Sequence, residues 1–262
     1  MNRKALALSI LWLIATISFA QTPQRILKVG ATPVPHAELL RLIEPDLAAQ
    51  GIRLQLVEFT DYVTPNIALA EGQLDANFFQ HVPYLESFSA ERKLSLEVAG
   101  IIHVEPLGIY SKKYHSLSDL PQGASIAIPN DPTNEGRALL LLASKGLITL
   151  KPDAGLKATL REIASNPRKF KFKELDAAQL PRTLRDVDAS VINGNYAIPA
   201  GLNPVKDAIA IEGAESPYAN IIAVRKGDTI DPRIVALVAA LRSTKVRDFI
   251  LASYGGGVVP AF

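Results

Sequence analysis

The sequence contains no cysteine, and this absence excludes several kinds of protein at once. No disulfide can stabilise the fold, so the chain depends on its hydrophobic core, which 262 residues are enough to build. No cysteine nucleophile is available for catalysis, and no cysteine stands near the N-terminus to carry a lipid anchor. We therefore expect a soluble protein rather than one attached to a membrane.

Blocks of like charge, low-complexity tracts and internal repeats are also missing. Charged residues make up 21% of the chain and hydrophobic residues 48%, which is an ordinary globular composition. The formal net charge is only +2, and basic residues do not alternate with aromatic ones along any stripe. We therefore expect no nucleic-acid partner.

The most apolar run lies at the N-terminus and is too short for a stable membrane anchor. After the basic start MNRK, residues 5–17 read ALALSILWLIATI. The small residues Ser18 and Ala20 then occupy the positions that a signal peptidase reads. This pattern predicts a signal peptide over residues 1–20 and export of the remaining chain.

Segments typical of strands and helices alternate along the rest of the chain. Strands are predicted at 25–32, 52–59, 74–79, 96–113 with a break near Pro106, 124–130, 169–175, 188–194, 207–212 and 218–227. Helices are predicted at 35–51, 63–72, 83–93, 131–146, 176–184, 196–201 and 231–254. This order indicates an α/β protein with mostly parallel sheets. Residues 107–117 and 220–228 each read as an apolar strand leading into a basic turn. If both strands cross between lobes, the middle of the chain forms a second lobe, and a ligand cleft lies between the two lobes.

Aromatic residues are scarce, at 6%, yet three of them and a histidine gather in the stretch FFQHVPYL at 78–85. A helix beginning at its proline would make residues 79–82 a loop at the rim of the sheet. Ligands bind at this rim in open α/β sheets. We expect Phe79, His81 and Tyr84 to line an apolar pocket there. A cluster within the core is the alternative.

The stretch IPNDPTNEGRALLLL, at 128–142, predicts an anion site at the start of a helix. Asp131 suits the N-cap, and Pro132 suits the first helical position. Arg137, near the end of the second turn, can reach back towards the positive end of the helix dipole. Arginine binds a carboxylate or phosphate through two parallel hydrogen bonds. An exposed helix arginine is the alternative.

Three asparagines and a tyrosine complete the candidate site. Asn193 and Asn195 follow a predicted strand in VINGNYA, and Asn220 begins another. The amide of asparagine donates and accepts, which suits an α-amino and a carboxylate group. Turn formation is the stronger interpretation for Asn193 and Asn195 taken alone. Tyr62, just past a strand, reads by itself as a structural turn residue.

Motifs for catalysis or metal binding are not found. The chain has no Gly-x-Ser-x-Gly elbow, and its histidines, His36, His81, His103 and His115, lack metal-site spacing. We therefore predict a protein that is not an enzyme and that needs no cofactor and no metal.

Eight blocks, in order, make residues 26–262 similar to the methionine-binding periplasmic proteins of the MetQ/NlpA family. The blocks are FTDYVTPN, GQLDANFFQHVPYL, EPLGIYSKK, IPNDPTNEGRALLLL, ELDAAQLPRTL, VINGNYA, ESPYANIIAVR and GGGVVPAF. The resemblance implies a type II periplasmic-binding fold with two α/β lobes, a ligand cleft and two crossover strands. We place the first lobe at 21–110 and 220–262 and the second at 111–219.

The resemblance also implies a function, the binding of L-methionine or a close analogue and its delivery to the permease and ATPase of an ABC importer. By motif, the side-chain pocket comprises Tyr62, Phe79, His81 and Tyr84, and the polar groups comprise Arg137 for the carboxylate, Asn193 or Asn195, and Asn220. D-methionine, another amino acid or a short methionyl peptide remain alternatives. An exported enzyme using His81 and an adhesin are further alternatives. Because the family's lipid-attachment cysteine is absent, we expect a soluble periplasmic monomer.

Overall fold

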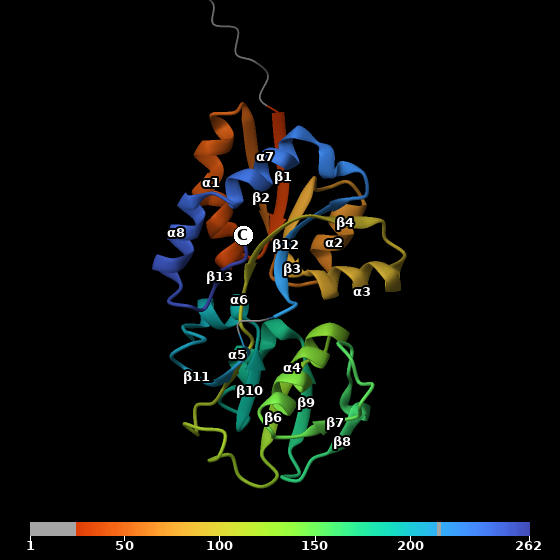
Figure 1. Cartoon of the computed structure of the whole chain (residues 1–262), viewed down its shortest axis with the longest axis vertical. Coiled ribbons are helices and arrows are strands. Elements are labelled where there is room, and N and C mark those ends of the chain that lie inside the picture. The colour runs from red at the N-terminus through yellow and green to blue at the C-terminus, as the bar shows by residue number, and fades with distance from the viewer. Residues whose placement is uncertain (1–24, 214–215) are drawn as a thin grey trace, which may run out of the picture.

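The computed structural model describes residues 25–213 and 216–262, so the predicted signal peptide lies outside the described residues. Figure 1 shows two lobes stacked along the long axis of the molecule. The N-terminal strands and C-terminal helices build the upper lobe, and the middle of the chain builds the lower one. None of the helices in the described residues is long and apolar enough to span a bilayer.

The first lobe is built on a six-stranded sheet with the order β13-β4-β12-β3-β1-β2. Its strands are β1 (Arg25–Ala31), β2 (Ile52–Glu58), β3 (Ala76–His81), β4 (Leu96–Val104), β12 (Ala219–Arg225) and β13 (Val259–Pro260). Its helices are α1 (Glu38–Ala48), α2 (Thr64–Ala70), α3 (Val82–Arg92), α7 (Pro232–Leu241) and α8 (Thr244–Ser253). Strand β1 is parallel to β2 and β3, whereas β12 is antiparallel to β3 and β4.

The second lobe is built on a five-stranded sheet with the order β11-β5-β10-β6-β9. Its strands are β5 (Gly108–Tyr110), β6 (Ser125–Pro129), β9 (Lys171–Leu175), β10 (Ala189–Ile192) and β11 (Ala208–Ile211). Its helices are α4 (Pro132–Ser144), α5 (Leu180–Thr183) and α6 (Gly194–Ala197), and β7 (Thr149–Leu150) pairs with β8 (Ile163–Ser165) beside them. Strand β6 is parallel to β9 and β10, but β5 is antiparallel to β10 and β11.

The expectation of mostly parallel sheets is wrong, because both sheets are mixed. The strand that enters each sheet after a crossing, β5 in the second lobe and β12 in the first, runs antiparallel to the neighbouring strand of a βαβ unit. The chain passes from β4 to β5 through residues 105–107 and returns from β11 to β12 through 212–218, of which 214 and 215 are not described. The lobe boundaries given above remain predictions.

Each sheet packs against helices to form its own core. In the first lobe, the buried face of α1 carries Leu39, Leu40, Ile43 and Leu47, all with no exposed surface. These side chains join those of β1 and β3 in one cluster. Burying a leucine or isoleucine stabilises the fold by about 1.5–3 kcal/mol. The two cores therefore keep the strand ends and helix starts in fixed positions at the boundary between the lobes.

Two of the differences between predicted and observed boundaries have a clear local cause. Strand β3 runs through His81, and α3 begins at the next residue, so the predicted loop at 79–82 is wrong. No loop is needed because the His81 side chain itself caps the helix, accepting a hydrogen bond from the backbone N–H of Tyr84 at 3.2 Å. The helix predicted at 231–254 is two helices, because Ser243 caps the start of α8.

Candidate functional site

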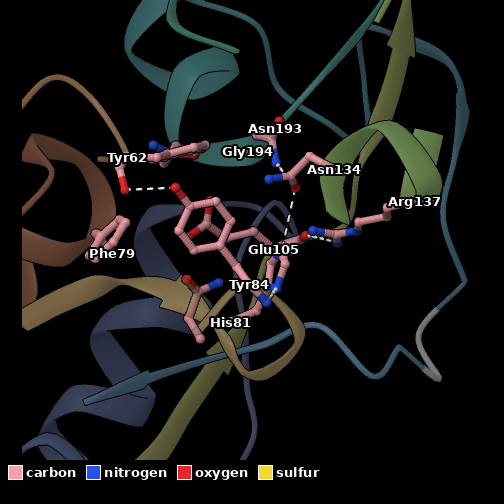
Figure 2. A pocket seen from close by; sticks show the side chains of 11 residues that line it. Tyr62, Phe79, His81, Tyr84, Glu105, Asn134, Arg137, Asn193 and Gly194 are labelled. Carbon is pink, nitrogen blue, oxygen red and sulfur yellow. Dashed lines mark hydrogen bonds between the residues drawn. The ribbon is translucent and has the colours of Figure 1, made fainter. Parts of the chain in front are cut away.

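One cavity at the boundary between the lobes is lined by all eight predicted site residues. These residues are Tyr62, Phe79, His81, Tyr84, Arg137, Asn193, Asn195 and Asn220. Three further residues that we did not predict complete the lining: Glu105, Asn134 and Gly194. The cavity is narrow in this structure, with a volume of about 20 Å³. Figure 2 shows Tyr62 and Phe79 on one side and Asn134 and Arg137 on the other.

The apolar side of the cavity is a set of mutually packed rings from the first lobe. The ring centre of Tyr62 lies 5.9 Å from those of both Phe79 and Tyr84. The hydroxyl group of Tyr84 donates a hydrogen bond to the backbone oxygen of Tyr62 at 2.8 Å. This bond fixes Tyr62, which lies in the loop between β2 and α2, against β3 and α3. The rings therefore form a preformed wall with little conformational freedom left to lose.

His81 is an uncharged member of the cavity lining. Burial, and then the positive charge of Arg137, lower its pKa to about 3. Its Nδ1 atom accepts the capping hydrogen bond from α3, so the ring proton is on Nε2. That atom lies 3.3 Å from Oδ1 of Asn134 and donates to it. His81 therefore connects the start of α3 in the first lobe to α4 in the second.

Arg137 is 3% exposed, so the alternative of an exposed helix arginine is excluded. As predicted, Asp131 caps α4, accepting a hydrogen bond from the backbone N–H of Asn134 at 3.0 Å. The guanidinium group donates from Nε and Nη2 to the carboxylate of Glu212, at 3.0 and 2.5 Å. It also stacks over Tyr218, 4.3 Å from the ring centre. Among the described residues Nη1 makes no hydrogen bond, which leaves a charged donor for a ligand.

Asn193 and Asn195 each present a buried polar atom without a partner in the described part of the chain. The Nδ2 group of Asn193 donates to Asn134 at 2.8 Å, but its Oδ1 atom has no donor there. Oδ1 of Asn195 accepts from the hydroxyl group of Tyr62 at 2.5 Å, but its Nδ2 group has no acceptor there. A buried polar group left unpaired costs about 1–3 kcal/mol. The pair therefore offers one acceptor and one donor to a bound molecule, which turn formation does not explain.

Glu105 lines the cavity and is 4% exposed, but we did not predict it as a site residue. It directly follows β4, and its Oε1 atom lies 2.9 Å from Nε2 of His103 and 3.4 Å from Nε2 of His36. Burial raises its pKa. Its side chain lies against Gly194, where an added Cβ atom would lie 2.7 Å from Oε2. Only glycine fits beside this carboxylate.

The fold thus gathers Glu105 with His36 and His103, two histidines that we had dismissed as metal ligands on their spacing. Their ligand atoms all lie within 4.8 Å of one another. The 2.9 Å distance between Nε2 of His103 and Oε1 of Glu105 is that of a hydrogen bond, however. His36 has a further partner on each nitrogen, since Nδ1 lies 2.7 Å from Oγ1 of Thr32 and Nε2 lies 3.1 Å from Oδ1 of Asn220. The cluster is therefore a hydrogen-bonded unit of which Glu105 lines the cavity.

The fold consists of two α/β lobes joined by two crossings. The lobes enclose a cavity that is lined by aromatic rings and by polar side chains. This arrangement defines a two-lobed substrate-binding protein. The model of the family described as NlpA lipoprotein matches residues 27–262. The chain therefore belongs to the NlpA lipoprotein family, as its eight sequence blocks predicted.

Named relatives of this family cover most of the chain. The methionine-binding lipoprotein MetQ of Bacillus subtilis is 44% identical over 92% of this chain and 90% of its own length. The D-methionine-binding lipoprotein MetQ of Escherichia coli is 44% identical over 80% of this chain and 78% of its own length. The solved structure of a nutrient-binding protein from Burkholderia cenocepacia bound to methionine is 50% identical, with a TM-score of 0.88 over 90% of this chain and 100% of that one. The predicted two-lobed fold is confirmed by this likeness.

The expectation that the protein carries no lipid anchor is wrong. We expected a soluble, non-lipidated protein, but the matching family is described as lipoproteins and both MetQ relatives are named lipoproteins. The expectation rested only on the absence of a cysteine. An absent residue does not establish that a protein is free in solution.

Proposed function

We propose that this protein binds methionine between its two lobes and delivers it to the permease and ATPase of an ABC importer. The observation that carries the proposal is one cavity that combines an aromatic wall with unpaired polar atoms on buried side chains. An α-amino acid with an apolar side chain combines the complementary groups. The names of the relatives support methionine in particular.

The polar end provides groups for both charges of an amino acid. Nη1 of Arg137 and the Nδ2 group of Asn195 are donors, so we assign them to the ligand's carboxylate. Oδ1 of Asn193 is an acceptor, so we assign it to the ammonium group. On this assignment both asparagines contact the ligand, one at each charged group. Asn220 lines the same end, with its Oδ1 atom occupied by His36.

The aromatic end suits a thioether. Contacts between sulfur and aromatic rings are worth about 0.3–1.5 kcal/mol each. Burial of the side chain adds about 1.5–3 kcal/mol, and each charge-assisted hydrogen bond adds roughly the same. The entropy lost on binding subtracts from this sum. A dissociation constant below about 1 μM, or about −8 kcal/mol, is attainable on these terms.

Binding without catalysis is the function that the site favours. His81 is the only residue of the cavity that we considered as a general base. A pKa of about 3 makes it a weak base near neutral pH, and both of its ring nitrogens are engaged within the protein. We therefore propose a receptor rather than an enzyme acting on an amino-acid derivative.

Native mass spectrometry of the purified protein, followed by denaturation and identification of any released molecule, tests the proposal. Calorimetric titration of refolded, ligand-free protein with L-methionine, D-methionine and a methionyl dipeptide then ranks the ligands. We expect tight binding of methionine. A protein that binds none of the amino acids contradicts the proposal. Methionine uptake by membrane vesicles that contain the importer tests the delivery step separately.

A further inference from the structure

We propose that Glu105 binds the ammonium group of the ligand, and that His36 and His103 are positioning residues that hold its carboxylate. Because this role presupposes an amino-acid ligand, it rests on the proposed function. It adds an ionic partner to the single neutral acceptor assigned to the ammonium group above.

The distribution of charge in the cavity is the first support. Of the residues that line it, only Arg137 and Glu105 carry a formal charge once His81 is neutral. The charge of Arg137 is already matched by Glu212 through two hydrogen bonds. Arg137 donates to the backbone oxygen of Glu105, at 2.8 Å, and not to its carboxylate. Glu105 is therefore the acid of the cavity that has no cation of its own among the described residues.

The protonation of the two histidines is the second support. Nε2 of His36 faces two acceptors, Oδ1 of Asn220 and Oε1 of Glu105, so it carries the ring proton. His103 has its only hydrogen bond among the described residues through Nε2, also to Oε1. Burial lowers the pKa of His36 to about 4 and that of His103 to about 3. The neutral ring of His103 thus donates to Oε1 of Glu105, and the neutral ring of His36 lies 3.4 Å from the same oxygen, so the two histidines hold the carboxylate in place without neutralising its charge.

The position of the second carboxylate oxygen is the third support. An added Cβ on Gly194 would lie 2.7 Å from Oε2 of Glu105 and 2.8 Å from its Cβ. Gly194 opens α6, between the two asparagines with unpaired atoms. Oε2 therefore lies on the side of the carboxylate where Asn193 and Asn195 face the cavity. An ammonium group bound at Oδ1 of Asn193 would therefore also lie near Oε2 of Glu105.

Proton linkage follows from this arrangement. The titratable and charged groups in contact with Glu105 are His36, His103 and Arg137. The charge of Glu105 also acts on the tyrosines Tyr62 and Tyr254. Burial raises the pKa of Glu105, against the opposing effects of His36, Arg137 and the backbone N–H of Asn195. An ammonium group favours the ionised carboxylate and so lowers this pKa again. Binding therefore releases a proton from the fraction of Glu105 that is protonated, and affinity rises with pH until Glu105 is fully ionised.

The decisive experiment compares methionine with its hydroxy acid analogue, which has a hydroxyl in place of the ammonium group. We expect the wild-type protein to prefer methionine by about 30-fold or more, since a buried charge pair is worth roughly 2–5 kcal/mol. In Glu105→Gln, which is nearly isosteric, we expect methionine affinity to fall by a similar factor while the hydroxy acid binds at least as well as before. An unchanged preference in Glu105→Gln overturns the role of Glu105. Failure of the wild-type protein to bind methionine instead overturns the proposed function.

Proton release tests the positioning residues and does not depend on affinity alone. Titrations in buffers of different ionisation enthalpy give the number of protons released. We expect this number to be positive for the wild-type protein at pH values where part of Glu105 is protonated, and zero for Glu105→Gln. We expect His103→Leu to weaken methionine binding and change proton release, and His103→Gln, which keeps a donor, to restore both. Equal behaviour of the two His103 variants contradicts the positioning role. Denaturant unfolding of each variant identifies any that is not folded.

Discussion

The hydroxyl group of Tyr62 donates a 2.5 Å hydrogen bond to Oδ1 of Asn195, and this bond joins the two lobes across the cavity. A second bond nearby runs from the hydroxyl group of Tyr196 to the backbone oxygen of Thr60, at 3.0 Å, and the rings of Tyr62 and Tyr196 are 5.1 Å apart. Tyr62 and Asn195 both line the cavity. Contact between the lobes and contact with a ligand therefore depend on the same side chains.

Replacing Tyr62 with phenylalanine tests this connection. Tyr62→Phe keeps the ring wall but leaves Oδ1 of Asn195 without its donor. We expect methionine affinity to fall about three- to tenfold, since a hydrogen bond contributes roughly 0.5–1.5 kcal/mol. Stopped-flow measurements should place most of the change in the dissociation rate. The matched variant Tyr196→Phe removes a bond between the lobes without altering the cavity lining. Equal dissociation rates for Tyr62→Phe and the wild-type protein contradict the expectation.

The ion pair of Arg137 with Glu212 predicts a specific result for a double variant. Arg137→Ala removes the carboxylate donor, and it also leaves the Glu212 side chain, 15% exposed, without its cation. We expect binding to be lost and the free energy of unfolding to fall by roughly 1–3 kcal/mol. In Arg137→Ala with Glu212→Gln, stability should largely recover in urea unfolding, whereas calorimetry should still show no binding. Recovery of binding in the double variant contradicts the role of Arg137.

Gly136 is required by the packing of α4 against the segment that follows it. A Cβ atom there would lie 2.8 Å from the carbonyl carbon of Leu156 and 2.9 Å from the backbone nitrogen of Ala158. Gly136→Ala should lower the free energy of unfolding by about 1–3 kcal/mol, because backbone atoms must move. Methionine affinity should fall too, because α4 carries Arg137. Gly213→Ala is the control, since an added Cβ meets no described atom within 4 Å. Equal melting temperatures for the two variants contradict the packing argument.

The buried histidines predict that stability decreases as the pH is lowered. Burial lowers the pKa of His36 to about 4 and of His81 and His103 to about 3. Between these values and the ordinary value of about 6.5, the unfolded chain binds protons that the folded chain does not, so unfolding becomes easier. Glu105, Asp131 and Glu135, whose pKa values are raised, act in the opposite direction. We expect the three histidines to prevail and the free energy of unfolding to fall between pH 7 and pH 5.

Urea unfolding at several pH values, without ligand, measures this loss. His115 is exposed and provides the control, so His115→Asn should keep the wild-type dependence on pH. His103→Gln should make it shallower. A stability that does not change between pH 7 and pH 5 contradicts the expectation that these histidines stay neutral when folded.

Much of the fold could be predicted because its signals are local. Asp131 and Pro132 mark the start of α4, and the apolar periodicity of α1 marks its buried face. Strand direction could not be predicted in this way. Nothing local distinguishes β12, which is antiparallel to its neighbours, from a strand of a βαβ unit. The break between α7 and α8 had a local signal in Ser243, which we did not use.

Site residues could be predicted where an unusual residue type marks them. They could not be predicted where their role depends on contacts with residues that are distant in the sequence. Asn134 could have been found, because it lies three residues before Arg137 and so faces the same side of α4. Glu105 could not, because its setting comes from His36, His103 and Gly194, which are distant from one another in the sequence. The partner of Arg137, Glu212, lies in the other crossing and is equally remote.

The two crossings of the chain each place a glutamate against the same guanidinium group. Glu105 follows β4 and Glu212 follows β11, and Arg137 donates to the backbone of the first and the carboxylate of the second. A rotation of one lobe about these crossings would therefore change the distances within the ligand site at its polar end. The segments that connect the lobes are then also sensors of occupancy. Occupancy of the cavity and the relative orientation of the lobes would then be coupled through a single guanidinium group.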